Sequence, residues 1–190
     1  MERGVDKYIN AYKGSLVARL VYAFEMAQDQ TADTVPHERI ILPKELQIVW
    51  SSDDRYWRMP PKDEPHQPAE LLQVMWLEVT GSVNNVDPSK TYEIGFSVSM
   101  TPDAFGWKDC PVHVVTKFGR RGNYVRRKTN LSLVHPAGKE IEIPGTLLIG
   151  KNQAPANSTR ETLYFGMYEV WSGKWKGGLK IHHAYVRERN

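Results

Sequence analysis

The chain is poor in cysteine and has no long apolar run. Cys110 is the only cysteine among its 190 residues, so no disulfide can form within the chain. This composition is typical of proteins from reducing compartments. The longest apolar run is far shorter than the roughly 20 residues that cross a membrane, and the first residues, MERGVDKYINAYKG, lack the basic and apolar regions of a secretory signal. We therefore expect a cytoplasmic or nuclear protein with no membrane partner.

Metal-binding and catalytic patterns are also missing from the sequence. The six histidines do not have ligand spacing with a cysteine or a carboxylate cluster. His182 and His183 are neighbours on a predicted strand, so they point to opposite faces. No nucleophile motif surrounds Cys110, and no phosphate-binding glycine loop occurs. We expect no metal, no cofactor and no catalysis.

Strong net charge is absent as well. A net charge of +3 does not by itself indicate nucleic acid or anionic lipid. The basic residues do gather in one segment, however: Arg120, Arg121, Arg126, Arg127 and Lys128. The simpler interpretation is the solvated edge of a hairpin. The alternative is a patch that binds RNA or another polyanion, or a nuclear-import signal.

Residues 5 to about 30 have a pattern of their own. Apolar side chains recur at the three- and four-residue spacing of an amphipathic helix: Val5, Tyr8, Ile9, Tyr12, Leu16, Leu20 and Phe24. A polar stretch that ends at Pro36 follows and reads as a linker. We expect residues 1–38 to be a helical extension that packs on the main domain or pairs with a second copy in a homodimer.

From residue 39 to residue 190 the pattern is that of β-structure. Runs of strand-forming residues alternate with turn clusters rich in proline, glycine, asparagine and aspartate. The expected strands are Leu46–Trp50, Gln73–Val79, Thr91–Met100, Val112–Phe118, Tyr124–Val134, Glu140–Ile143, Thr162–Val170 and Leu179–Arg187. Many short strands with little helix among them predict an all-β fold, an antiparallel β-sandwich of the jelly-roll kind.

Two aromatic clusters carry the functional signal. LQIVWSSDDRYWRM places Trp50 and Trp57 on either side of a polar turn, and EVWSGKWK places two more tryptophans at the end of a predicted strand. Sugar rings expose C–H patches that stack on aromatic faces, and their hydroxyls need fixed donors and acceptors. The candidate carbohydrate-binding residues are Trp50, Asp53, Asp54, Tyr56, Trp57, Glu169, Trp171 and Trp175.

Alternation along the strands suggests different environments for these residues. Leu46, Ile48 and Trp50 share a face, so Trp50 is expected to point toward the core. Trp57 lies beyond the turn and is the expected exposed stacking residue. Glu169 continues an apolar series at the end of its strand, where a carboxylate must be paired or lie at the rim. We expect it at the rim.

Several ordered blocks carry a family resemblance: IVWSSDDRYWRM, AELLQVMWLEVTGSV, TYEIGFSVSMTPDAFGWKDCPVHV and WSGKWKGGLKIHHAYVRER. Between Leu46 and Arg189 the chain resembles the phloem protein 2 family, the Nictaba-related plant phloem lectins. The resemblance implies a β-sandwich lectin that binds N-acetylglucosamine oligomers and N-glycan cores. The family's sugar-binding tryptophans correspond to Trp50 and Trp57, and a binding glutamate corresponds to Glu169.

The resemblance also implies a location and partners. Members are nucleocytoplasmic, abundant in phloem sieve elements and companion cells, often dimeric, and associated with phloem filaments or RNA transport. The chain departs from the family pattern at Val186–Arg189 and in its added N-terminal segment. We expect a lectin. The alternatives are a phloem transport protein that binds RNA or another polyanion through residues 120–128, and a structural filament protein.

Overall fold

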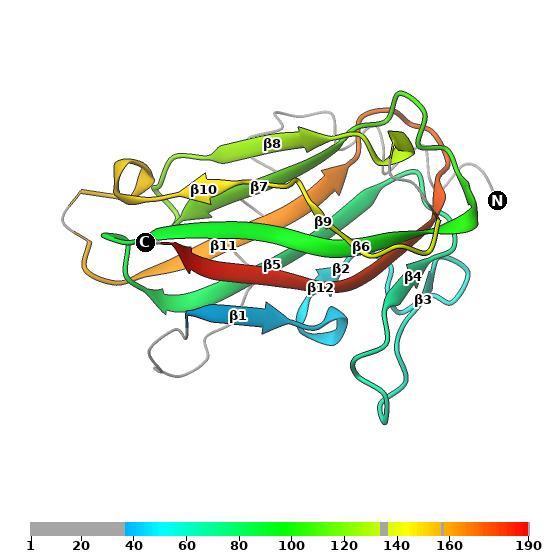
Figure 1. Ribbon diagram of the computed structural model, residues 1–190, viewed down its shortest axis with the longest axis horizontal. Coiled ribbons are helices and arrows are strands. Elements are labelled where there is room, and N and C mark those ends of the chain that lie inside the picture. The colour runs from blue at the N-terminus through cyan, green and yellow to red at the C-terminus, as the bar shows by residue number, and fades with distance from the viewer. Residues whose placement is uncertain (1–36, 134–136, 157, 190) are drawn as a thin grey trace.

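The computed structural model of the protein describes residues 37–133, 137–156 and 158–189. The helix expected over residues 5–30 lies outside the described residues. Within them, two antiparallel sheets pack face to face as a β-sandwich (Figure 1). The helical elements are short 3-10 turns, η1 (Pro43–Glu45), η2 (Leu131–Leu133) and η3 (Lys151–Gln153). The all-β prediction is confirmed.

The larger sheet has seven strands arranged around one long pair. β6 (Thr91–Phe105) and β12 (Gly177–Arg189) pair along most of their length. The shorter strands of this sheet are β1 (Glu38–Ile41), β3 (Trp57–Arg58), β4 (Ala69–Leu71), β9 (Ile141–Ile143) and β10 (Leu148–Ile149). β1 and β4 pair with β12, β3 pairs with β4, and β9 and β10 pair with β6.

The smaller sheet has five strands in the order β2-β5-β11-β7-β8. Their bounds are β2 (Gln47–Ile48), β5 (Leu77–Val86), β7 (Val112–Phe118), β8 (Val125–Thr129) and β11 (Glu161–Glu169). Each strand is antiparallel to its neighbours, as expected.

The core lies between the sheets and follows the alternation of the sequence. In β11 the residues Leu163, Phe165 and Met167 are fully buried and face the other sheet. The rings of Phe165 and Phe96 meet across the sandwich at a centroid distance of 6.0 Å and an interplanar angle of 64°. An edge-to-face aromatic pair of this kind adds to the hydrophobic free energy that holds the sheets together.

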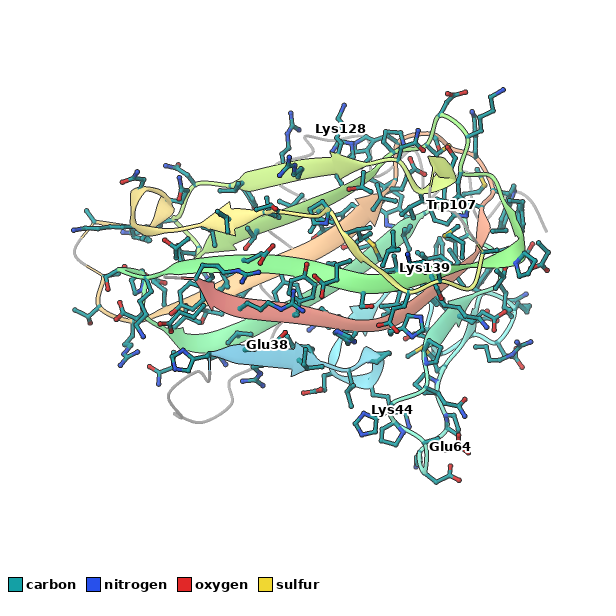
Figure 2. All side chains as sticks on the ribbon, in the orientation of Figure 1. Glu38, Lys44, Glu64, Trp107, Lys128 and Lys139 are labelled. Atoms are coloured by element: carbon teal, nitrogen blue, oxygen red, sulfur yellow. The ribbon has the colours of Figure 1, made fainter. Side chains whose placement is uncertain are left out.

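Three connections that carry aromatic side chains lie at one end of the sandwich. The register pairs Glu169 with Leu77, and Tyr168 with His113, so the end of β11 lies beside the beginnings of β5 and β7. The β2–β3 connection joins this end because the Val49 N–H donates to the Glu78 carbonyl. We refer to residues 49–56, 106–113 and 169–176 as the aromatic end. Figure 2 labels Trp107 there, and shows the connection that carries Glu64 projecting from another part of the molecule.

Candidate functional site

Trp50 and Trp57 occupy environments opposite to those expected. Trp57 is 2% exposed, whereas Trp50 is 41% exposed. Trp57 belongs to β3, where it pairs with Leu71, and its indole N–H donates to the Val49 carbonyl oxygen at 3.1 Å. The expectation that Trp50 faces the core and that Trp57 presents the exposed stacking face is therefore wrong.

The backbone of Trp50 explains the reversal. Its φ of 63° lies in the left-handed region, so β2 ends before Trp50 and the alternation that buries Leu46 and Ile48 does not extend to it. The indole instead lies beside the Tyr56 ring, at a centroid distance of 5.4 Å. Trp50 and Tyr56 together form one aromatic surface of the aromatic end.

The acidic turn between the two tryptophans is only partly available to a ligand. The Arg55 side chain hydrogen bonds to both oxygens of Asp53, at 2.9 Å from Nε and 2.6 Å from Nη2, and lowers the pKa of this carboxyl. The Arg55 guanidinium also lies 5.4 Å from the centre of the Tyr56 ring. Asp54 is exposed. Of the two aspartates, Asp54 is therefore the one whose carboxylate faces solvent beside the aromatic surface.

Glu169 is buried, not placed at an open rim, and its oxygens are already occupied. It is 2% exposed. One carboxylate oxygen accepts the N–H groups of Trp171 and Ser172 at 3.3 and 3.0 Å. The other accepts the Ser172 hydroxyl at 2.9 Å and lies 2.5 Å from the Lys176 ammonium. Glu169 therefore holds the loop that carries Trp171 and offers no free acceptors to a sugar.

Lys176 completes this internal connection. Its ammonium donates to the carbonyl oxygens of Met75 and Lys174 at 3.0 and 2.8 Å, in addition to its contact with Glu169. The ammonium therefore has an acceptor for each of its protons. The loop between the two residues is tied to the sandwich from within, while Trp171 and Trp175 are 43% and 46% exposed.

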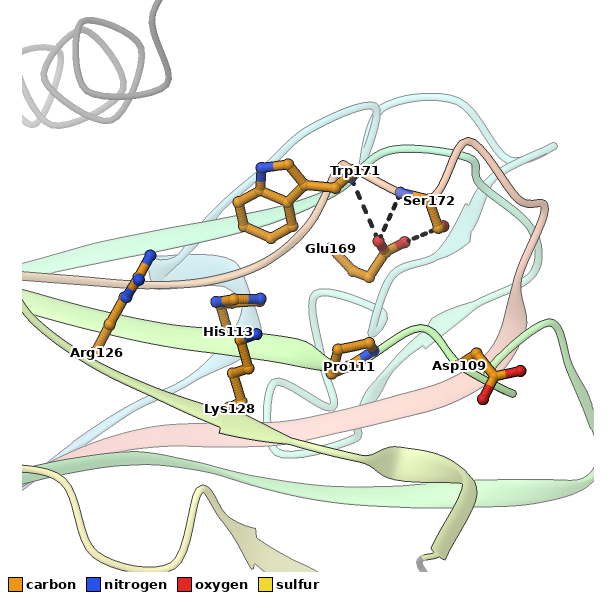
Figure 3. A pocket seen from close by; sticks show the side chains of 8 residues that line it. All are labelled: Asp109, Pro111, His113, Arg126, Lys128, Glu169, Trp171 and Ser172. Carbon is orange, nitrogen blue, oxygen red and sulfur yellow. Dashed lines mark hydrogen bonds between the residues drawn. The ribbon is translucent and has the colours of Figure 1, made fainter.

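A pocket of about 350 Å³ opens beneath Trp171 (Figure 3). Its floor is His113 at the start of β7, whose ring centre lies 4.4 Å from that of Trp171, with the planes inclined at 51°. The lining residues are Asp109, Pro111, His113, Arg126, Lys128, Glu169, Trp171 and Ser172. The arrangement combines an exposed aromatic face with charged groups of both signs, which is suited to a small polar ligand with an apolar face.

The register of β7 and β8 brings the two basic residues into this pocket. His113 pairs with Lys128 and Val115 pairs with Arg126, so both basic side chains share the outward face of the sheet with His113. Burial lowers the pKa of His113, and the charges of Lys128 and Arg126 lower it further. The imidazole is therefore neutral at pH 7.

The basic segment does not form a single patch. Arg127 alternates to the other face of β8, where it donates to the Thr146 carbonyl oxygen. Arg120 and Arg121 are exposed and follow the far end of β7. Because a strand rises about 3.3 Å per residue, they lie well away from His113 at its start. Only Arg126 and Lys128 of the predicted cluster join the pocket.

Sequence reasoning therefore separated residues that the fold brings together. Trp171 and Glu169 were assigned to a sugar site and Arg126 and Lys128 to a polyanion patch, yet all four line one pocket. His113, Asp109 and Pro111 were not proposed at all. The alternation within VHVVTKF and VRRKT indicates which side chains of each strand point outward. The register between the two strands depends on their pairing, which no local pattern reveals.

In residues 37–133, 137–156 and 158–189, no group of three or more His, Cys, Asp or Glu side chains is placed to hold a metal ion. No helix in the same residues is long and apolar enough to span a membrane.

Comparison with known proteins places the chain in a family. The family model described as phloem protein 2 matches residues 37–188. The chain is 42% identical over 154 residues to phloem protein 2-like A9 of Arabidopsis thaliana, covering 77% of this chain and 84% of that protein. It is 37% identical over 83 residues to a lectin of Luffa acutangula, covering 41% and 39%. A solved structure of a ruminal endo-beta-1,4-mannanase aligns with 84% of this chain and 27% of the mannanase chain, with 9% sequence identity and a TM-score of 0.43. This similarity is too remote to bear on function. The chain belongs to the phloem protein 2 family.

Proposed function

We propose that the protein is a non-catalytic lectin that binds N-acetylglucosamine oligomers or N-glycan cores at the aromatic end. The observation that carries this proposal is the exposed indole of Trp171, held over His113 beside an open pocket. Membership of the phloem protein 2 family and the similarity to a Luffa lectin support a carbohydrate ligand.

The pocket offers the contacts that a pyranose needs. One face of a sugar ring stacks on Trp171, which removes apolar C–H groups from water. Asp109 is exposed on the opposite side of the pocket, so its carboxylate can accept a hydrogen bond from a hydroxyl or an acetamido N–H. A shallow site of this kind has a dissociation constant between about 1 mM and 1 μM.

The surface formed by Trp50 and Tyr56 is the proposed second contact for a longer oligomer. It lies at the same end of the sandwich as Trp171 and carries the exposed Asp54 beside it. Trp175 adds a third exposed aromatic side chain to this end. Occupation of more than one surface by a single oligosaccharide raises its apparent affinity without any new type of contact.

Titration with chitotriose tests the proposal. Trp171→Ala should reduce binding at least tenfold, because the stacking face is lost, while the far-UV spectrum and the melting temperature stay those of the wild type. Leu148→Ala removes an equally exposed apolar side chain from β10, which lies outside the aromatic end, and should bind like the wild type. Undiminished binding by Trp171→Ala would contradict the proposed site.

A second candidate function is binding of RNA through Arg126 and Lys128. In the described residues neither side chain has an ion-pair partner, which favours an anionic ligand. Salt distinguishes the two candidates, because affinity for a phosphate backbone falls steeply between roughly 50 and 200 mM salt. Sugar stacking hardly responds to salt. RNA binding with a steep salt dependence, together with no response to chitotriose, would favour this second function.

We also propose a cytoplasmic or nuclear protein of the phloem, in keeping with its family, that forms a homodimer or associates with filament proteins through the segment 5–30. Deleting residues 1–36 leaves every described strand in place. Light scattering should then show a monomer in place of a dimer. An unchanged mass would remove this segment from assembly.

A further inference from the structure

We infer that the pocket beneath Trp171 takes an acidic saccharide, in which one ring stacks on the indole and a carboxylate on the ring pairs with Arg126 and Lys128. This inference rests on the proposed lectin function and adds a charged ring to the ligand that the pocket takes. The neutral sugar proposed above and the acidic sugar proposed here would bind in the same pocket. Ligands that differ only in charge therefore distinguish the two proposals.

The first observation is that the two cations have no counter-charge among the residues that the structure describes. Arg126 and Lys128 are exposed on one face of β8, two residues apart. Over residues 37–133, 137–156 and 158–189, neither takes part in any of the ion pairs. Arg58, also exposed, is paired with Glu70 at 3.0 Å, whereas the exposed Arg120 and Arg121 resemble Arg126 in forming no ion pair with the described residues but lie outside the pocket. The two cations therefore leave a positive charge at the β8 side of the pocket.

The second observation is that the carboxylate of Glu169, which also lines the pocket, is already paired and does not compensate this charge. The Glu169 oxygens are turned into the loop, where Lys176 lies at 2.5 Å and Ser172 and the backbone N–H groups occupy the remaining positions. Glu169 and Lys176 neutralise each other in the interior. The charge that the pocket presents to a ligand comes from Arg126, Lys128 and Asp109.

The third observation is that these charges are separated across the pocket. Figure 3 shows Arg126 at one side of the pocket, Lys128 next to His113, and Asp109 at the other side beyond Pro111. The neutral imidazole, whose pKa burial and the two cations lower, adds a flat surface but no charge. A ligand that lies on Trp171 and spans the pocket thus meets cations at one end and an acceptor at the other.

The chemistry of these groups favours a carboxylated sugar ring. A guanidinium binds a carboxylate through two parallel hydrogen bonds, and an ammonium adds a point charge beside it. Trp171 requires a ligand with an apolar face next to that carboxylate. A volume of about 350 Å³ suits a small ligand segment. A uronic acid residue in an oligosaccharide meets all of these requirements.

The test compares a hyaluronan tetrasaccharide with its methyl ester. The tetrasaccharide alternates N-acetylglucosamine with glucuronate, and esterification keeps every ring but removes the charge. Calorimetric titration at 20 mM salt should show the acid binding to the wild-type protein about tenfold more tightly than the ester. Arg126→Gln/Lys128→Gln should abolish that difference.

A matched control excludes a general effect of net charge. Arg120→Gln/Arg121→Gln removes the same charge from the same segment outside the pocket, and it should keep the tenfold preference. Equal reduction by both double variants would indicate unspecific attraction and overturn the inference. Equal binding of acid and ester by the wild type, with normal binding of chitotriose, would also overturn it while leaving the lectin function intact. Failure of all three oligosaccharides to bind would reject both.

Discussion

The ammonium of Lys176 lies 2.5 Å from the carboxylate of Glu169, and the two side chains are 0% and 2% exposed. The pair joins the end of β11 to the residue before β12 across the loop that carries Trp171 and Trp175. A buried ion pair of this kind compensates the desolvation of both charges only while both partners are present. Its removal is the most direct way to test what supports the aromatic end.

Replacing Glu169 with alanine should destabilise the protein by about 3–5 kcal/mol, because it leaves the Lys176 ammonium buried without a counter-charge. Urea unfolding followed by tryptophan fluorescence measures the change. Arg58→Gln, which breaks the exposed pair with Glu70, should cost about 0–1 kcal/mol. The double variant Glu169→Gln/Lys176→Met should cost less than the sum of its single changes. Equal unfolding midpoints for Glu169→Ala and Arg58→Gln would contradict the structural role.

Trp57 and Trp50 should respond to alanine substitution in opposite ways. Trp57→Ala removes a buried indole and should cost about 3–5 kcal/mol of stability. Trp50→Ala removes an indole that is 41% exposed, and should change the stability far less while it weakens the binding of long chitin oligomers. Thermal unfolding and calorimetric titration of both variants separate the two effects. A stable Trp57→Ala variant that has lost only binding would restore the interpretation from alternation.

Two glycines at the aromatic end provide a matched pair of backbone tests. Gly106 and Gly173 both have positive φ, at 80° and 64°. A Cβ on Gly106 would lie 2.0 Å from the Trp175 carbonyl oxygen, whereas a Cβ on Gly173 would meet nothing within 4 Å. Gly173→Ala should cost about 1 kcal/mol for the left-handed conformation alone, and Gly106→Ala clearly more. Similar melting temperatures for the two variants would show that the 106 and 175 segments are not in contact.

His113 should titrate below its ordinary pKa of 6.5, chiefly because of burial and then because of Lys128 and Arg126. NMR titration of the imidazole measures this directly. In Arg126→Gln/Lys128→Gln the pKa should rise but stay below 6.5, since burial remains. In Arg120→Gln/Arg121→Gln it should not move. An equal shift in both double variants would place the charges that act on His113 outside the pocket.

The lowered pKa of His113 determines the direction in which it makes stability depend on pH. A histidine whose pKa is lowered in the folded state binds fewer protons there than in the unfolded state, so stability falls as the pH drops below about 6.5. The pKa of His182 is lowered too, again mainly by burial, so it contributes in the same direction. His113→Phe should therefore reduce the loss of stability between pH 6.5 and 5, and His113→Phe/His182→Phe should reduce it further. An unchanged slope would contradict the lowered values.

The outline of the fold followed from local pattern, but the site did not. The strand expected at Val112–Phe118 is present with those bounds, and the one expected at Thr162–Val170 is displaced by a single residue. β3 was missed because two residues of a polar segment carry no alternation of their own. The burial of Trp57 depends on its pairing with Leu71 and on a carbonyl of a separate loop. Such contacts depend on tertiary pairing, which local sequence does not encode.

The charge contacts of the aromatic end could not be predicted from local sequence either. Glu169 and Lys176 are seven positions apart and flank a loop, so their contact requires both strands to be in place. Arg126 and Lys128 were recognised as basic, but their position beneath Trp171 follows from the β7–β8 register. The pattern identified the right residue types and assigned them to separate sites.

The anchoring of the 170–176 loop from within has a kinetic consequence. Because Glu169 and Lys176 already order this loop before any ligand is present, binding does not have to fix its conformation, and the entropy cost of association is reduced. Such a site should bind as a rigid surface, with an association rate that varies little from one ligand to the next. Differences in affinity among sugars should then arise from how quickly each one leaves.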